Sequence, residues 1–273
     1  DKTGTITENT MQVNQVIPAK NAPENPAFSL ESVLSDFADA MSSDNITMEA
    51  MKAYFKKGTG RKAVSITSFS SAFKYSSATF SDGSYVLGAP EFVLREDFPA
   101  YQPEIEPYPS QGYRVLVFGS YQGIPDGKAL NGPVTPLGYV LLSNPIRKEA
   151  PETFRYFEEQ GVEVKVISGD NPQTVSEVAK QAGIVNAERF IDASTLKTDE
   201  EIENAVLNYT VFGRVTPDQK RKFVHALKDA GKTVAMTGDG VNDVLALKDA
   251  DCSIAMASGS DAAAQASQLV LLD

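Results

Sequence analysis

The sequence predicts an α/β protein in which a parallel-sheet domain is split by an inserted α+β domain with an antiparallel sheet. From residue 137 onward, short apolar runs alternate with segments of helical periodicity, which is typical of parallel strands joined by helices. Residues 11–136 differ, because they are rich in Ser, Tyr, Phe and turn residues and carry few helical signals. We therefore expect residues 1–14 and 139–273 to form one domain and residues 15–138 to form the other.

The inserted region has few elements that its sequence marks clearly. Helical signals occur mainly at residues 29–41 and 47–56. Ser81-Asp82-Gly83 stands between two strand-like runs, as in the turn of a β-hairpin. Residues 99–109 hold several prolines and are expected to form a loop. This domain is therefore expected to be mixed or mostly antiparallel.

The later region is marked by helix-start signals that follow apolar runs. The run at 162–168 is followed by Asn171, a good N-cap, and by Pro172, a good first helical residue. Thr216 and Pro217 begin a second helix in the same way. The other apolar runs are expected to be strands of the same parallel sheet: 137–143, 209–215, 233–237, 253–257 and 269–272.

Composition excludes several classes of function. The chain has 273 residues and a formal net charge of -11, so binding to a nucleic acid is disfavoured. Cys252 is the only cysteine and His225 the only histidine, which excludes disulfides, Cys-based zinc sites and histidine triads. No apolar run approaches the ~20 residues that cross a bilayer. We expect this part of the protein to be soluble and monomeric.

Two motifs combine carboxylates with glycine. Residues 1–7 read Asp-Lys-Thr-Gly-Thr-Ile-Thr, and residues 237–243 read Thr-Gly-Asp-Gly-Val-Asn-Asp. Asp239 and Asp243 follow a short apolar strand and lie where a helix begins near Asn242. A Gly-rich turn capped by Asn242 would account for the loop but not for two carboxylates, which repel each other unless a cation lies between them. Oxygen ligands at the end of a strand suit Mg²⁺.

Two further segments suit an anion. Ser168 and Gly169 lie at the start of a helix, where a hydroxyl and backbone N–H groups can bind a phosphoryl group. Lys220 lies in the first turns of the helix that begins at Thr216, where the helix dipole disfavours a cation. Its ammonium therefore needs an anionic partner or solvent, and beside the other motifs a phosphate is favoured.

Together these motifs resemble the P-type cation-transporting ATPases, and the resemblance covers essentially the whole chain. Residues 1–7 resemble the family's phosphorylation signature, and residues 237–243 resemble its second diagnostic motif. In the inserted region, Phe69 followed five residues later by Lys74 resembles the family's adenine pocket. The resemblance implies a haloacid-dehalogenase-like, Rossmann-type phosphorylation domain split by a nucleotide-binding domain.

The chain departs from the family's pattern at several positions. Leu87 stands where the family normally has Lys, and Met48 where a Glu commonly helps to hold adenine. The hinge segment Asn144-Pro145-Ile146-Arg147 has Asn in place of the more usual Asp. These changes imply weak ATP binding with modest discrimination between ATP and GTP.

The resemblance also implies a role for each matching residue. Asp1 would be the nucleophile that takes the γ-phosphate of ATP. Mg²⁺ would be held by the Asp1 carboxylate, the Thr3 carbonyl and Asp239. The groups that stabilise or order the transferring phosphoryl group would be Ser168, Gly169, Lys220, Asn242 and Asp243. ATP would be contacted by Phe69, Lys74, Gly88 and Arg114, with Asp170 and Arg214 as further ribose or phosphate contacts.

The resemblance has implications for the whole protein as well. ATP would be the substrate, and the transmembrane and actuator domains of the same polypeptide would be the partners, at the cytoplasmic face of the cell membrane. The chain lacks the His-Pro pair of the heavy-metal subclass, so we expect Ca²⁺ or another non-heavy-metal cation as cargo. In the family an apolar strand precedes the nucleophile, and we expect the natural protein to continue upstream of Asp1.

Two rival functions remain open. A soluble haloacid-dehalogenase-type phosphatase usually carries a general-acid Asp two residues after the nucleophile, where this chain has Thr3. A non-enzymatic nucleotide-binding module would not need Asp1, Lys220, Asp239 and Asp243 together. An acid-stable, hydroxylamine-labile phosphorylated species would distinguish these functions.

Overall fold

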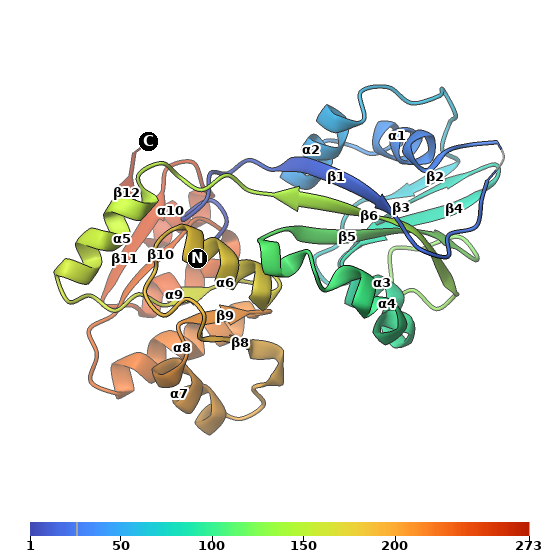
Figure 1. Cartoon of the computed structure of the whole chain (residues 1–273). Coiled ribbons are helices and arrows are strands. Elements are labelled where there is room, and N and C mark those ends of the chain that lie inside the picture. Colours follow the sequence, from blue (N-terminus) through green and yellow to red (C-terminus); the bar gives the residue numbers. More distant parts are fainter. Residues whose placement is uncertain (26, 273) are drawn as a thin grey trace. The chain divides into compact units, whose positions relative to one another are not determined.

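The chain folds into two compact units in the computed structural model, which describes residues 1–25 and 27–272 (Figure 1). The first unit comprises Asp1–Thr10, Pro109–Gly112 and Asn144–Asp273. The inserted unit comprises Met11–Tyr108 and Tyr113–Ser143.

The two units differ in the kind of sheet that they contain. The inserted unit holds the strands β1 (Gln12–Pro18), β2 (Ser65–Thr67), β3 (Tyr75–Phe80), β4 (Gly83–Gly88), β5 (Arg114–Tyr121) and β6 (Val134–Ser143), and the helices α1 (Leu30–Ala40), α2 (Ile46–Tyr54), α3 (Pro90–Leu94) and α4 (Phe98–Ile105). The strands of the first unit are β7 (Val166–Ile167), β8 (Phe190–Asp192), β9 (Val211–Gly213), β10 (Ala235–Gly238), β11 (Cys252–Met256) and β12 (Leu269–Leu271). Its helices are α5 (Ala150–Glu159), α6 (Pro172–Gln181), α7 (Asp199–Asn208), α8 (Pro217–Asp229), α9 (Val244–Asp249) and α10 (Asp261–Ala266).

The six strands of the inserted unit form one antiparallel sheet in the order β1-β6-β5-β4-β3-β2. Helices α1 and α2 cover one face, where Phe37 and Met51 pack with Phe118 and Leu142 of the sheet (Figure 1). Helices α3 and α4 cover the other face. Both faces are apolar, so the sheet is buried on both sides and the unit has two layers of core.

The strand at residues 137–143 belongs to this antiparallel sheet, so its prediction as a strand of the parallel sheet is wrong. β6 pairs antiparallel with β1 from Gln12↔Ser143 to Pro18↔Gly138, and with β5 along its other edge. The unit boundaries accordingly fall after Thr10 and Ser143, rather than after residues 14 and 138. An apolar run is compatible with a buried strand in either a parallel or an antiparallel sheet, and only the strands that pair with it distinguish the two.

One turn prediction is confirmed and one loop prediction is wrong. β3 and β4 form the predicted hairpin, with Phe80 opposite Gly83. Residues 98–105, expected as part of a loop, form helix α4 instead. Pro99 lies in its first turn, where a missing N–H costs nothing, and Ile105 is buried in the core. Burial of an apolar face outweighed the proline at 103 inside the helix.

The first unit contains two three-stranded parallel sheets, β7-β9-β8 and β10-β11-β12, where a single parallel sheet was expected. Among the described residues, no strand pairs with both β7 and β10. The helix starts predicted at Asn171 and Thr216 are confirmed, whereas α9 begins at Val244 without a cap from Asn242. Asn171 caps α6 by accepting hydrogen bonds from the backbone N–H groups of Gln173 and Thr174, and Thr216 caps α8 in a capping box with Gln219.

Among the described residues, no helix combines the length and apolarity that a membrane span requires.

A buried ion pair ties α1 to the segment that leads into β2. The Asp36 side chain is 1% exposed and accepts hydrogen bonds from Arg61 Nε at 2.7 Å and from Thr59 Oγ1 at 2.7 Å. The Arg61 guanidinium also contacts Asp82 at 2.7 Å and lies over the ring of Phe28. Burial alone would raise the pKa of Asp36, but these hydrogen bonds outweigh it and hold the pKa below its ordinary value of 3.8.

We expect Asp36→Ala to lower the free energy of unfolding by about 3–5 kcal/mol, because it leaves the Arg61 charge without its buried partner. Because the pKa of Asp36 is lowered in the folded state, this stabilisation is present above pH 3.8 and is lost as the pH falls below that value. Urea unfolding measures the effect. Asp39→Ala, an exposed carboxylate on the same helix, is the control and should change little; equal losses in both variants would contradict the prediction.

Candidate active site

The first residues of the chain lie beside the end of β10. The backbone nitrogen of Asp1 donates to the carbonyl of Thr237 at 3.1 Å. The backbone then turns tightly, since the N–H groups of Ile6 and Thr7 both donate to the carbonyl of Lys2. This turn and β10 bring Asp1 next to the motif at residues 237–243.

Two glycines allow the backbone to approach Asp239 closely, Gly4 at its carboxylate and Gly259 at its backbone. Gly4 has φ +77°, and a Cβ built on it would lie 1.8 Å from Asp239 Oδ2. A Cβ on Gly259 would lie 2.4 Å from the Asp239 carbonyl oxygen. A side chain at either position would collide with Asp239, and at Gly4 it would also be strained.

Three carboxylates meet at this point. One oxygen from each of Asp1, Asp239 and Asp243 lies within 4.8 Å of the others. Burial and the neighbouring Asp243 carboxylate raise the pKa of Asp239 above its usual range. Carboxylate oxygens are the ligands that Mg²⁺ prefers, and clustered acids that repel one another gain from a cation between them. The site therefore fits a magnesium ion.

Lys220 supplies the positive charge of the site. Its ammonium lies 2.6 Å from Asp243 Oδ1 and 3.3 Å from Asp1 Oδ1, and the residue is 6% exposed. Burial would raise the pKa of Asp243, but Lys220 outweighs it and lowers the pKa below its usual range. The anionic partner that Lys220 needs near the start of α8 is therefore a pair of carboxylates.

An ion pair links the segment at Ser168–Asn171 to Lys2 in the turn that follows Asp1. The Lys2 ammonium lies 2.8 Å from Asp170 Oδ2, and the Lys2 side chain is 2% exposed. Ser168 is buried, and its hydroxyl accepts the N–H of Asp170 at 3.2 Å. The sequence motif did not predict a role for Lys2, although its place between the predicted site residues Asp1 and Thr3 indicated one.

The other predicted residues of the first unit are more open. Thr3 is half-buried, and Asn242 is exposed. Arg214 has φ +51°, and its guanidinium donates to the Gly169 carbonyl at 3.4 Å. A Cβ on Gly169 would meet no atom closer than 3.7 Å, so there is space beside this backbone.

The predicted nucleotide contacts lie in the inserted unit. Phe69 is 43% exposed, and Lys74 has φ +58°. A Cβ on Gly88 would lie 2.4 Å from the Lys74 carbonyl oxygen, so this close approach requires glycine. Arg114 begins β5 and is half-buried.

Leu87 and Met48 do not line an open pocket. They are 2% and 3% exposed and belong to the core under α1 and α2. Neither side chain is therefore placed to contact a base, and Leu87→Lys would put an ammonium in apolar surroundings.

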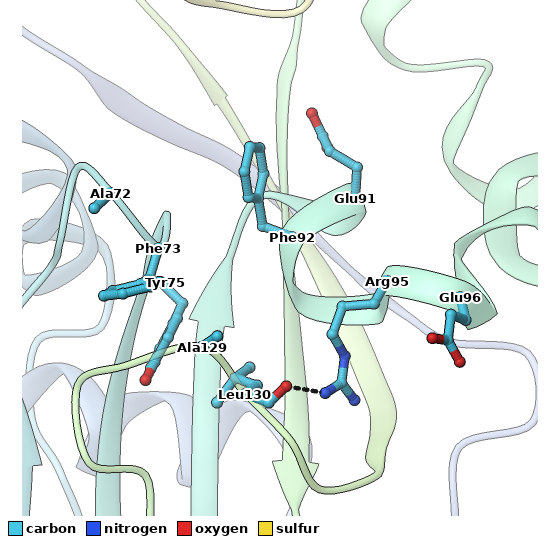
Figure 2. Close-up of a pocket in the computed structure, with 9 residues that line it drawn as sticks. All are labelled: Ala72, Phe73, Tyr75, Glu91, Phe92, Arg95, Glu96, Ala129 and Leu130. Atoms are coloured by element: carbon cyan, nitrogen blue, oxygen red, sulfur yellow. Dashed lines mark hydrogen bonds between the residues drawn. The ribbon is translucent and has the colours of Figure 1, made fainter.

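A pocket of about 470 Å³ lies next to the Phe69–Lys74 loop (Figure 2). Its walls include Phe73, Phe92 and Leu130, with Glu96 and Arg95 on one side. Both terminal nitrogens of Arg95 donate to backbone carbonyls, those of Leu130 and Gly132. This guanidinium therefore holds the pocket wall in place.

Comparison with known proteins identifies the relatives of the chain. Residues 1–251 match the family of haloacid dehalogenase-like hydrolases. The calcium-transporting ATPase CtpE of Mycobacterium tuberculosis is 43% identical over 275 residues, which cover 100% of this chain and 34% of that protein. A probable cation-transporting ATPase of Streptococcus pneumoniae is 39% identical, over 100% of this chain and 35% of that protein.

A solved structure has the same fold. A zinc-transporting PIB-type ATPase in its E2.Pi state matches with a TM-score of 0.55 and 22% identity, over 98% of this chain and 37% of that one. The chain thus spans about a third of the length of the proteins it matches. It belongs to the haloacid dehalogenase-like hydrolases, and over its whole length it is similar to the catalytic region of P-type cation-transporting ATPases.

Proposed function

We propose that this chain transfers the γ-phosphate of ATP to Asp1 and forms an aspartyl phosphate. The observation that supports this most directly is the position of Lys220, between the Asp1 and Asp243 carboxylates with Asp239 beside them. The ATPases that resemble the chain act on ATP, and members of that family use Mg²⁺ with it.

In the transfer step, a carboxylate oxygen of Asp1 attacks the γ-phosphorus. A bond forms between that oxygen and phosphorus, while the bond from phosphorus to the β–γ bridging oxygen breaks. ADP leaves with the electron pair of the broken bond, and no proton transfer is required. Thr3 stands where a phosphatase would carry its general acid, so the aspartyl phosphate is expected to persist.

The other residues of the site would stabilise charge on the transferring group. The Lys220 ammonium, the Ser168 hydroxyl and the Gly169 N–H would contact its oxygens. Asn242 and Asp243 would order the site around them. The ion pair with Lys2 would fix the position of Asp170. Asp170 would therefore stabilise the 168–171 turn, in addition to its proposed contact with ATP.

A magnesium ion would be held by the Asp1 carboxylate, the Thr3 carbonyl and Asp239. Bound there, a divalent cation screens the approach of the phosphate to the carboxylates.

The inserted unit would bind the nucleotide. Phe69 would stack on adenine, and Lys74, Gly88 and Arg114 would contact ATP, with Arg214 of the first unit as a further contact. Leu87 and Met48 are buried and uncharged, so neither gives the nucleotide a charged contact. We therefore expect ATP to bind with a Kd of roughly 0.1 to several mM.

The whole protein would be a pump at the cytoplasmic face of a membrane, with transmembrane and actuator domains in the same polypeptide. Calcium is the proposed cargo, because relatives at 43% identity over the full chain are named calcium-transporting ATPases.

The proposal is tested by incubating the chain with Mg²⁺ and ATP labelled at the γ-phosphate, then quenching in acid. We expect labelled protein that hydroxylamine releases, and slow release of phosphate. Rapid turnover at ~10 s⁻¹, typical of enzymes, would identify a free-standing phosphatase instead. Nucleotide binding without any labelled protein would identify a non-enzymatic module.

The position of adenine is tested by Phe69→Ala. We expect ATP binding to weaken by about 5- to 150-fold, because stacking on one base contributes about 1–3 kcal/mol. Calorimetric or NMR titration measures the change. Phe92→Ala is the control, since Phe92 is 39% exposed in the same unit and lines the pocket of Figure 2. Weaker binding in the Phe92 variant alone would place the base in that pocket.

A further inference from the structure

The segment at Asn144–Arg147 pairs with the turn that follows Asp1. The N–H of Glu8 donates to the Pro145 carbonyl at 2.8 Å, and the N–H of Arg147 donates to the Ile6 carbonyl at 3.0 Å. Thr7 and Ile146 form an antiparallel bridge between them. This short ladder places the side chain of Arg147 beside Gly4.

The Arg147 guanidinium joins two segments that are far apart in the sequence. Its Nη2 donates to the Gly4 carbonyl at 3.0 Å and to Ser258 Oγ at 3.4 Å. Gly4 belongs to the turn after the nucleophile, whereas Ser258 belongs to the loop between β11 and α10.

Both segments pack directly against Asp239. The Cα of Gly4 faces the carboxylate so closely that a Cβ would lie 1.8 Å from Oδ2. On the other segment, the N–H of Ser260 donates to the Asp239 carbonyl at 2.7 Å, and a Cβ on Gly259 would lie 2.8 Å from the Asp239 Cβ. Asp239 therefore lies between these two segments, and the Arg147 guanidinium connects them.

We infer that Arg147 is a positioning residue for the metal-binding carboxylate, because its guanidinium holds together the two segments that enclose Asp239. This inference rests on the proposed function, in which Asp239 is a metal ligand. Arg147 contacts neither the phosphate nor the metal in this role. It acts through Gly4 and Ser258, and it keeps Asp239 at a fixed distance from Asp1.

The inference is tested by metal affinity rather than by turnover. Mn²⁺ serves as a spectroscopic substitute for Mg²⁺, and free Mn²⁺ is measured by electron paramagnetic resonance during titration of the chain. Residues that orient metal ligands typically change affinity by about 10–100-fold when they are replaced, so we expect at least about 10-fold weaker binding in Arg147→Ala. Thermal unfolding of each variant shows whether the fold is kept.

Two further variants separate geometry from charge. Arg147→Lys keeps the positive charge but replaces the planar guanidinium, which can donate to two groups at once, by a single ammonium. We therefore expect it to bind Mn²⁺ as weakly as Arg147→Ala. Ser258→Ala removes the contact between Arg147 and Ser258 Oγ and should give a smaller loss of Mn²⁺ affinity, so it still tests the inference if the Arg147 variants fail to fold. The matched control is Lys148→Ala, the neighbouring exposed cation, which should leave affinity unchanged.

The outcomes distinguish this inference from the proposed metal site. Asp239→Asn must weaken Mn²⁺ binding if Asp239 is a ligand, and an unchanged affinity in that variant would overturn both the metal site and the role of Arg147. If Asp239→Asn behaves as expected but Arg147→Ala binds like the wild type, only the positioning role is overturned. Full affinity in Arg147→Lys would also overturn it, because charge rather than geometry would then suffice.

Discussion

Asp1→Asn is expected to reduce the labelled phosphoprotein below detection while leaving ATP binding intact. The amide has nearly the shape of the carboxylate but lacks a nucleophilic oxygen anion, so no acyl phosphate can form. Nucleotide binding should persist, because the proposed adenine contacts lie in the inserted unit around Phe69. Acid-quenched labelling and ATP titration are the two measurements.

The control for this variant is Glu8→Gln, which removes an exposed carboxylate from the same segment. It should be labelled like the wild type. Label that remains on the Asp1→Asn protein would show that another residue takes the phosphate. Loss of ATP binding together with labelling would show that binding and transfer are not divided between the two units as proposed.

Lys220→Ala is expected to impair both the chemistry and the stability of the first unit. Asp243 is 1% exposed and has the Lys220 ammonium at 2.6 Å, so the variant leaves a buried carboxylate beside two others. Removal of one partner of a buried ion pair costs about 3–5 kcal/mol of unfolding free energy. The loss of a donor to the transferring phosphoryl group should slow phosphorylation by about 10²–10³-fold.

Rapid-quench labelling and urea unfolding measure these two effects separately. Lys222→Ala is the matched control, since Lys222 lies two residues further along α8 and is 45% exposed, with Asp199 and Asp218 as partners. It should leave both the labelling rate and the unfolding free energy unchanged. A Lys220→Ala protein that is labelled at the wild-type rate would contradict the proposed role, whatever its stability.

The sequence by itself determined the motifs and the helix starts, because both depend on residues that are adjacent in the chain. Asn171 and Thr216 cap α6 and α8 as predicted, since a cap is a contact over two or three residues. The hairpin at Ser81-Asp82-Gly83 is equally local. The fold class follows from the same signals, and the match of residues 1–251 to the haloacid dehalogenase-like hydrolases confirms it.

Only the tertiary structure decided which distant groups meet. The apolar run at 137–143 is compatible with either sheet, and its pairing with β1 and β5 assigns it to the inserted unit. Leu87 stands at a position that the resemblance connects with ATP, yet its side chain lies in the core, because its strand presents that face to α1 and α2. The Lys2–Asp170 ion pair and the contacts of Arg147 with Gly4 and Ser258 span more than a hundred residues of sequence. Such contacts depend on side-chain packing across the fold, for which local periodicity and capping signals contain no information.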